Sequence, residues 1–191
     1  SSGTMQRPLP YAVVLARVVA TELQTWPEDR LGSAAFVPRD PGELVTRLRL
    51  ATFVPEVRDE ALLRWGFWGL RQGSEKGALD RLNEIGQTAD TYVDYLRHLF
   101  RGRALDRSDK HAEALDAYRM AVLAEPRAQT ARLALASALA SGNDRQDAFV
   151  ALGRALSDAT DVLADPWFMY GAADQRFWPA RITELRQAVR R

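Results

Sequence analysis

The stretch HAEALDAYRMAVLAEP, His111–Pro126, decides how this chain is expected to fold. Within it, Ala114, Tyr118 and Ala121 are separated by offsets of four and seven residues, which return to nearly the same face of an α-helix. The three side chains therefore form a small–large–small ridge, and Pro126 ends the run because proline cannot continue a helix. The pattern predicts a helix that packs closely against a neighbouring helix.

Two further stretches carry the same offsets, and the anchor alanines of the three ridges are 36 and 34 residues apart. The anchor is the first alanine of each ridge. A small residue lies twelve positions before each anchor, and a turn-forming residue lies five positions before it. We therefore expect a repeated helix–turn–helix unit, whose small residue lets the second helix approach the first and whose copies stack into a solenoid. The further ridges are Ala78, Leu82, Ile85 and Ala148, Leu152, Ala155; the small residues are Gly66, Gly102, Ala136; the turn formers are Gly73, Asp109, Asn143.

In these positions the chain resembles the tetratricopeptide repeat (TPR) superfamily over about residues 59–160, with repeats at about 59–90, 93–126 and 127–160. The resemblance implies an all-α solenoid whose first helices line a concave, ligand-binding groove. Arg101 and Gly69 depart from the pattern, which favours large apolar residues there.

Outside the repeats we expect an irregular N-terminal helical pair and a C-terminal helical cap at residues 161–191, within one domain at 7–191. Residues 1–6 are interpreted as a cloning scar or the start of a processed chain. Proline signals predict helix starts, because proline suits the first helical position and a preceding aspartate can cap it. These signals are Asp40-Pro41, the residues before Pro55, Asp165-Pro166 and Trp178-Pro179, and a first helix is predicted from about Pro10 to Gln24.

Composition narrows the function class. The formal net charge of +1 provides no global attraction to nucleic acid or membranes, and no apolar run is long enough to span a bilayer. All basic residues except Lys76 and Lys110 are arginines, which is typical of a GC-rich, bacterial genome. The chain has no cysteine, so it has no disulfide or thiolate chemistry and its compartment stays open: cytoplasmic, or periplasmic or secreted if a signal peptide was removed.

Catalytic motifs are absent from the sequence, including the nucleophile elbow, the Walker A loop, the dinucleotide glycine fingerprint and the zinc-protease motif. His98 and His111 fall on different predicted helices without metal-ligand spacing, and we interpret them as ordinary surface or turn residues. The pair Asp161 and Asp165 is interpreted as a solvated helix end. We expect no enzyme activity, no metal and no cofactor.

A basic stretch at residues 97–111 is the first candidate binding feature. Arg103 and Arg107 lie four apart on the helix that lines the groove in TPR proteins, so the resemblance implies a site for a peptide carboxylate. The alternative is a solvated arginine face with intramolecular ion pairs. The predicted groove residues are Leu63, Phe67, Arg71, Arg103, Arg107, Ser137 and Ser141.

An aromatic stretch at residues 164–179 is the second candidate. It either caps the apolar end of the solenoid or docks another chain. Its aromatic residues are Trp167, Phe168, Tyr170, Phe177 and Trp178.

These features favour a non-catalytic interaction module that binds a protein or peptide, acidic if the arginines recognise it, through the groove. The alternative is a structural or oligomerising scaffold that uses the aromatic end. Neither reading includes nucleic-acid binding or membrane insertion, and the oligomeric state stays open.

Overall fold

The computed structural model describes residues 41–142, 144–157 and 165–170. These residues divide into two compact units, 41–61 and 62–170. The predicted helix at Pro10–Gln24, the predicted start at Trp178-Pro179 and the aromatic residues Phe177 and Trp178 lie outside the described residues.

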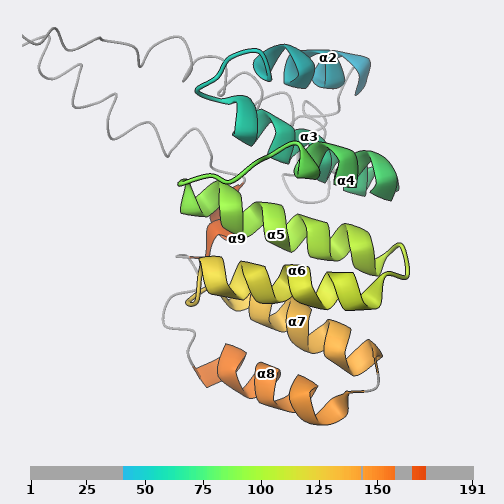
Figure 1. Cartoon of the computed structure of the whole chain (residues 1–191), viewed down its shortest axis with the longest axis vertical. Coiled ribbons are helices and arrows are strands. Elements are labelled where there is room, and N and C mark those ends of the chain that lie inside the picture. The colour runs from blue at the N-terminus through green and yellow to red at the C-terminus, as the bar shows by residue number, and fades with distance from the viewer. Residues whose placement is uncertain (1–40, 143, 158–164, 171–191) are drawn as a thin grey trace, which may run out of the picture. The chain divides into compact units, whose positions relative to one another are not determined.

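The described chain is helical and contains no strand, which confirms the all-α class (Figure 1). Helices α3 to α8 form three consecutive pairs with short connections, and each pair falls within one of the predicted repeat ranges, to within two residues at its start. The helices are α2 (Pro41–Ala51), α3 (Arg58–Arg71), α4 (Glu75–Asn83), α5 (Thr91–Asp106), α6 (His111–Ala124), α7 (Gln129–Ser141), α8 (Arg145–Ser157) and α9 (Pro166–Met169).

Two of the proline signals mark helix starts correctly. Helix α2 begins at Pro41, and α9 begins at Pro166, where the Asp165 side chain caps it by accepting a hydrogen bond from the Trp167 amide (2.9 Å). The start predicted near Pro55 is wrong, because α3 begins at Arg58. There the chain first forms tight turns, with the Val57 amide donating to the Val54 carbonyl oxygen (3.1 Å), before the α-helical ladder starts.

The small residues of the first helices allow close helix pairing. A Cβ atom added to Gly102 would lie 2.5 Å from two ring carbons of Tyr118, and one added to Gly66 would lie 2.6 Å from Leu82 Cγ. Such distances are too short for real contacts, so α5 and α6, like α3 and α4, approach only because glycine stands at these positions. Gly69 stands where the TPR pattern favours a large apolar residue. A Cβ atom added to it would lie 3.2 Å from the Ala78 amide nitrogen, so close approach of α3 and α4 also explains this glycine.

Two of the predicted turn formers adopt left-handed backbone. Gly73 has φ +72° between α3 and α4, and Asp109 has φ +58° between α5 and α6. Glycine and aspartate suit these positions because they tolerate positive φ better than β-branched or bulky residues. Asn143, at the third equivalent position, lies outside the described residues.

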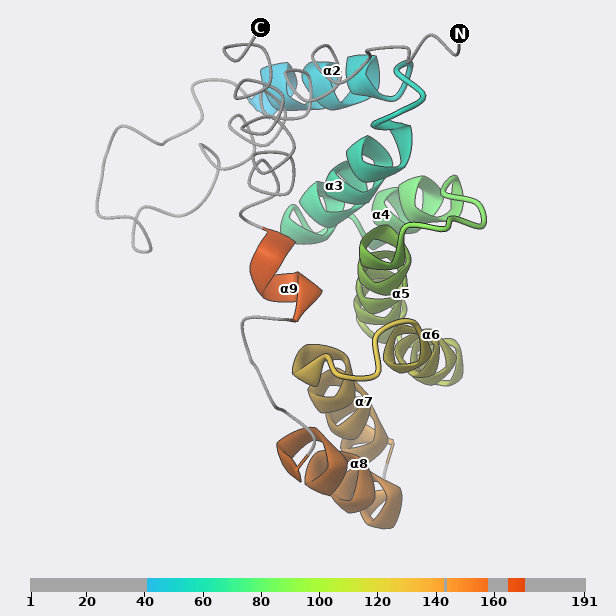
Figure 2. The same ribbon diagram turned by 90° about the vertical axis from the view of Figure 1, so that its left-hand side faces the viewer.

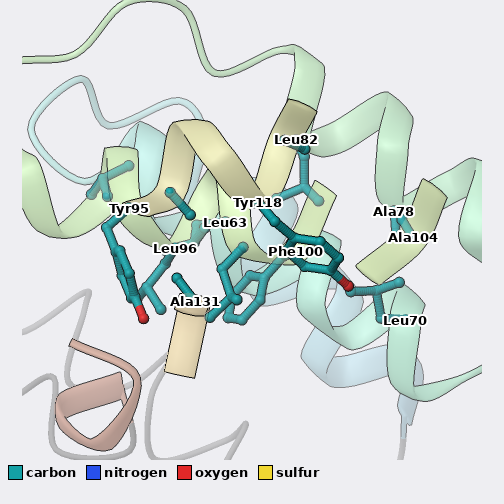
Figure 3. Packing of buried hydrophobic residues seen from close by; sticks show 14 of the residues in the cluster. Leu63, Leu70, Ala78, Leu82, Tyr95, Leu96, Phe100, Ala104, Tyr118 and Ala131 are labelled. Carbon is teal, nitrogen blue, oxygen red and sulfur yellow. The ribbon is translucent and has the colours of Figure 1, made fainter. Parts of the chain in front are cut away.

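One apolar core cluster extends from Leu62 on α3 to Ala138 on α7 and includes Tyr170 (Figure 3). Ala114 and Ala121 are fully buried in it, as the ridge of the opening stretch predicts. The third pair is packed less completely, because Leu152 on α8 is exposed whereas its counterparts Leu82 and Tyr118 are buried. The first helices of the pairs lie toward α9, and α4 and α6 lie on the far side of α5 (Figure 2).

Candidate functional site

A pocket of about 100 Å³ opens among the first helices and α9. We call it the aromatic pocket. Of the predicted groove residues it includes Phe67 and Arg103, and from the aromatic stretch it includes Trp167. Its lining is Phe67, Leu99, Phe100, Arg103, Tyr118, Thr130, Ala134 and Trp167.

The two arginines of the predicted groove, Arg103 and Arg107, differ in their contacts. The Arg107 side chain donates a hydrogen bond to the Leu70 carbonyl oxygen (2.9 Å) and pairs with Glu75 Oε1 (2.8 Å). It therefore links the end of α5 to the first helical pair, which corresponds to the alternative of intramolecular pairing rather than to a ligand site shared with Arg103. Within the described residues, the exposed Arg103 side chain makes no hydrogen bond or ion pair.

The other predicted groove residues lie outside the pocket lining. Leu63 is completely buried in the core, so it cannot provide an apolar wall at the surface. Arg71 is half-buried at the end of α3. Ser137 and Ser141 are exposed on α7, where the Ser141 hydroxyl donates to the Ser137 carbonyl oxygen (3.1 Å).

Four aromatic rings meet beside the pocket. Phe67 of α3 and Phe100 of α5 have ring centroids 4.7 Å apart. Trp167 and Tyr170 pack edge-on against both, with centroid separations of 5.0 to 5.8 Å. These tilted and edge-to-face arrangements match the preferred geometry of aromatic pairs, so the cluster fixes the position of residues 165–170.

The segment Asp165–Tyr170 is thus placed on the first helices rather than over the end of the last pair. Trp167 is half-buried and Tyr170 is fully buried, whereas Phe168 is 50% exposed. On α8, Phe149 remains 76% exposed. The aromatic partners of Trp167 and Tyr170 therefore lie on α3 and α5, and not at the end of the last pair, where the predicted cap would place them.

Arg64 is a site residue that the sequence analysis missed. It is only 1% exposed, its guanidinium lies 4.5 Å from the centroid of the Tyr170 ring, and its Nη2 donates to the Tyr170 carbonyl oxygen (3.1 Å). A cation over an aromatic face is attracted by the ring quadrupole, more strongly when water is excluded. A signal existed, because Arg64 precedes Phe67 by three residues and so shares its helix face.

The carboxylate of Asp165 is the second missed feature, and its interpretation as a solvated helix end is wrong. It is 2% exposed and accepts hydrogen bonds from the Tyr95 hydroxyl (3.0 Å) and the Thr130 amide (2.8 Å), in addition to its own cap. Thr130 lies in the first turn of α7, where free amides favour an anion. Burial, and next the charge of Asp165, raise the pKa of the Tyr95 phenol, which therefore stays protonated as a donor.

The two histidines differ in environment. His111 is exposed and lies 3.0 Å from Asp106, in line with its interpretation as a surface residue. His98 is buried within α5, so that interpretation is wrong for it. Its Nε2 accepts from Arg97 Nη2 (3.0 Å), and burial, followed by the charge of Arg97, lowers its pKa.

Metal sites and membrane-spanning helices are both absent from the described residues. No group of three or more histidine, aspartate or glutamate side chains is placed to hold a metal ion in the part of the chain that the structure describes. Among the helices described, none combines the length and the apolar character that a bilayer crossing requires.

Comparison with known proteins adds no relative. No protein-family model matches the chain, and no curated protein has a matching sequence.

Proposed function

We propose that the chain is a non-catalytic interaction module, a TPR-like solenoid that binds a peptide segment of a partner protein at the aromatic pocket. The observation that carries this proposal is the seating of residues 165–170 on the first helices. That segment is held by its carboxylate, its rings and a backbone carbonyl, which are groups that peptides offer to their receptors.

The repeated helix pairing supports the solenoid part of the proposal. The Gly66–Leu82 and Gly102–Tyr118 contacts occur at equivalent positions of successive pairs. A unit built in this way leaves the outer sides of its helices uncovered until a neighbour stacks on it. The first helices then follow one another along a single face, which is where α9 lies (Figure 2).

Arg103 supports a partner with an acidic group. It lines the pocket and is exposed, and its charge is not neutralised by an ion pair within the described residues. An arginine fork at the rim of an apolar pocket can bind a carboxylate with two parallel hydrogen bonds. We therefore expect the partner segment to combine apolar or aromatic side chains with at least one carboxylate.

A displayed random-peptide library tests this function. Peptides selected on the whole chain should lose binding to Phe67→Ala, which removes one wall of the pocket. They should keep binding to Phe149→Ala, a matched control because Phe149 is an exposed phenylalanine on α8. Circular dichroism first establishes that both variants are folded. If no enriched peptide discriminates between the two variants, the pocket is not the interaction surface.

A scaffold function is the second candidate, and the exposed apolar face of α8 favours it. Phe149, Leu152 and Leu156 are exposed and lie at helical offsets of three and seven residues, so they share one side of the helix. Contiguous exposed apolar surface is typical of protein contacts. Analytical ultracentrifugation of the chain and of Phe149→Ser/Leu156→Ser tests this candidate: concentration-dependent self-association should be present in the first and weaker in the second.

A further inference from the structure

The contacts of Asp165–Tyr170 come from all three helical pairs. Arg64 on α3 holds the Tyr170 carbonyl oxygen, Tyr95 on α5 holds the Asp165 carboxylate, and the Thr130 amide on α7 holds the same carboxylate. These partners are separated from the segment by 106, 70 and 35 positions in the chain. The segment is therefore bound by tertiary contacts alone, as a separate peptide would be.

The groups that hold the segment need an occupant. The Tyr95 hydroxyl is buried, and without Asp165 it would lose its acceptor. Arg64 is also buried, and its contacts include the Tyr170 carbonyl oxygen and ring. We call the surface that binds Asp165–Tyr170 the seat. A buried hydroxyl that loses its acceptor is costly, so the Tyr95 end of the seat requires an acceptor such as a carboxylate.

The spacing of these groups defines a recognition pattern. Asp165 caps the turn, Pro166 starts it, and Trp167 and Tyr170 reach the ring cluster from positions three and six. Phe168 contributes to none of these contacts with the first helices and is half-exposed. The pattern is an aspartate, then an aromatic residue two positions later and another five positions later.

The seated segment leaves part of the site unfilled. The aromatic pocket lies beside Trp167 and is lined by Arg103 and Tyr118, neither of which contacts α9 through a hydrogen bond among the described residues. A longer segment with the same pattern could fill the pocket and bind Arg103 as well. A partner can therefore gain contacts that the chain's own segment does not make.

We propose that Asp165–Tyr170 is an exchangeable internal ligand, and that the partner presents an Asp-x-aromatic-x-x-aromatic segment that displaces it. This inference rests on the proposed function and specifies its ligand and its regulation. The apparent affinity for the partner equals the intrinsic affinity multiplied by the fraction of molecules whose seat is empty, so an internal segment that is mostly bound weakens partner binding. The internal segment also competes at the high effective concentration of a tethered ligand.

A hexapeptide with the sequence of residues 165–170, amidated at its C-terminus so that its last carbonyl is kept as an amide, tests the exchange. It carries a fluorophore on an N-terminal linker, and fluorescence anisotropy measures its binding to two forms of the 191-residue chain. One form is the natural chain, and the other is the triple variant Asp165→Ala/Trp167→Ala/Tyr170→Ala, in which the seat lacks its occupant. The triple variant should bind at least tenfold more tightly than the natural chain.

Peptide variants distinguish specific recognition from non-specific hydrophobic binding. Replacing the aspartate of the peptide by alanine should weaken binding to the triple variant at least tenfold. Replacing its second aromatic residue, the equivalent of the half-exposed Phe168, should leave binding within twofold. A folded triple variant that does not bind the hexapeptide, or that binds these two peptide variants equally, overturns the proposal.

A second measurement decides the question if the triple variant does not fold. Because the chain has no cysteine, Phe168→Cys can be labelled at that site alone with a nitroxide. Millimolar hexapeptide should raise the mobility of the nitroxide in the electron paramagnetic resonance spectrum, and the alanine-substituted peptide should not. An unchanged spectrum overturns the exchange, whereas pocket-dependent peptides from the library would still support the proposed function.

Discussion

The hydroxyl of Tyr95 donates to Oδ1 of Asp165 across 3.0 Å, and this bond joins the middle pair of helices to the C-terminal segment. The same carboxylate accepts from the Thr130 amide at the start of α7. Asp165 therefore holds α5, α7 and α9 together at a single buried charge.

Tyr95→Phe tests the strength of this link. The substitution keeps the buried ring but removes one of the donors to a buried carboxylate, and we expect a loss of ~1–3 kcal/mol in the free energy of unfolding. Urea denaturation followed by circular dichroism measures it. In a double-mutant cycle with Asp165→Asn the two losses should be less than additive, and strict additivity would mean that the bond contributes nothing.

Gly102→Ala tests the close pairing of α5 and α6. Its new methyl group would lie 2.5 Å from the Tyr118 ring, so the helices must separate, and we expect a destabilisation of about 1–3 kcal/mol. Gly153→Ala is the matched control, because it is also helical and no heavy atom lies within 4 Å of the added Cβ. The control should be neutral or stabilising by up to about 1 kcal/mol, since alanine favours helix. Equal melting temperatures for Gly102→Ala and the natural chain would contradict the pairing.

His98 should make stability fall in mild acid. Burial and the neighbouring Arg97 lower its pKa in the folded chain, so the unfolded chain binds the proton first as the pH falls through about 6.5. The contribution of neutral His98 is present above that pH and is lost below it; Asp94 partly opposes the shift, and Arg101 adds to it. Urea unfolding at intervals from pH 7.5 to 5 measures the slope. His98→Gln, which does not titrate, should flatten the curve in this range, and an unchanged slope would assign the effect to other groups.

Arg103 and Arg107 should separate binding from stability. Arg103→Ala should weaken peptides selected on the aromatic pocket roughly fivefold, or ~1 kcal/mol, with less effect in high salt, and leave the melting temperature unchanged. Arg107→Ala should lower the melting temperature, because it removes the bond to the Leu70 carbonyl oxygen and the Glu75 pair, without changing peptide affinity. Titration calorimetry measures the peptide affinity of both variants, and thermal denaturation measures their melting temperatures. A loss of affinity in both variants would instead support a ligand site shared by Arg103 and Arg107.

The site was predictable only in part, and particular residues explain why. Phe67 and Trp167 were identified because large aromatic side chains at helical or loop positions are conspicuous in a sequence. Arg64 and Asp165 were not, because a charged residue is expected at the surface until its buried partners are known. Arg107 was assigned to the ligand because its spacing to Arg103 is correct, whereas the conformation of its side chain depends on Leu70 and Glu75.

By itself the sequence determined the all-α class, the helix pairs from α3 to α8 and the turns at Gly73 and Asp109. These features depend on local spacing and backbone preference, which are encoded in residues close together in the chain. Only the tertiary structure decided that Asp165–Tyr170 lies on the first helices rather than over the last pair. That outcome depends on Arg64, Tyr95 and Thr130, residues far apart in the chain whose buried donors converge on one carboxylate and one carbonyl oxygen once the helices have packed.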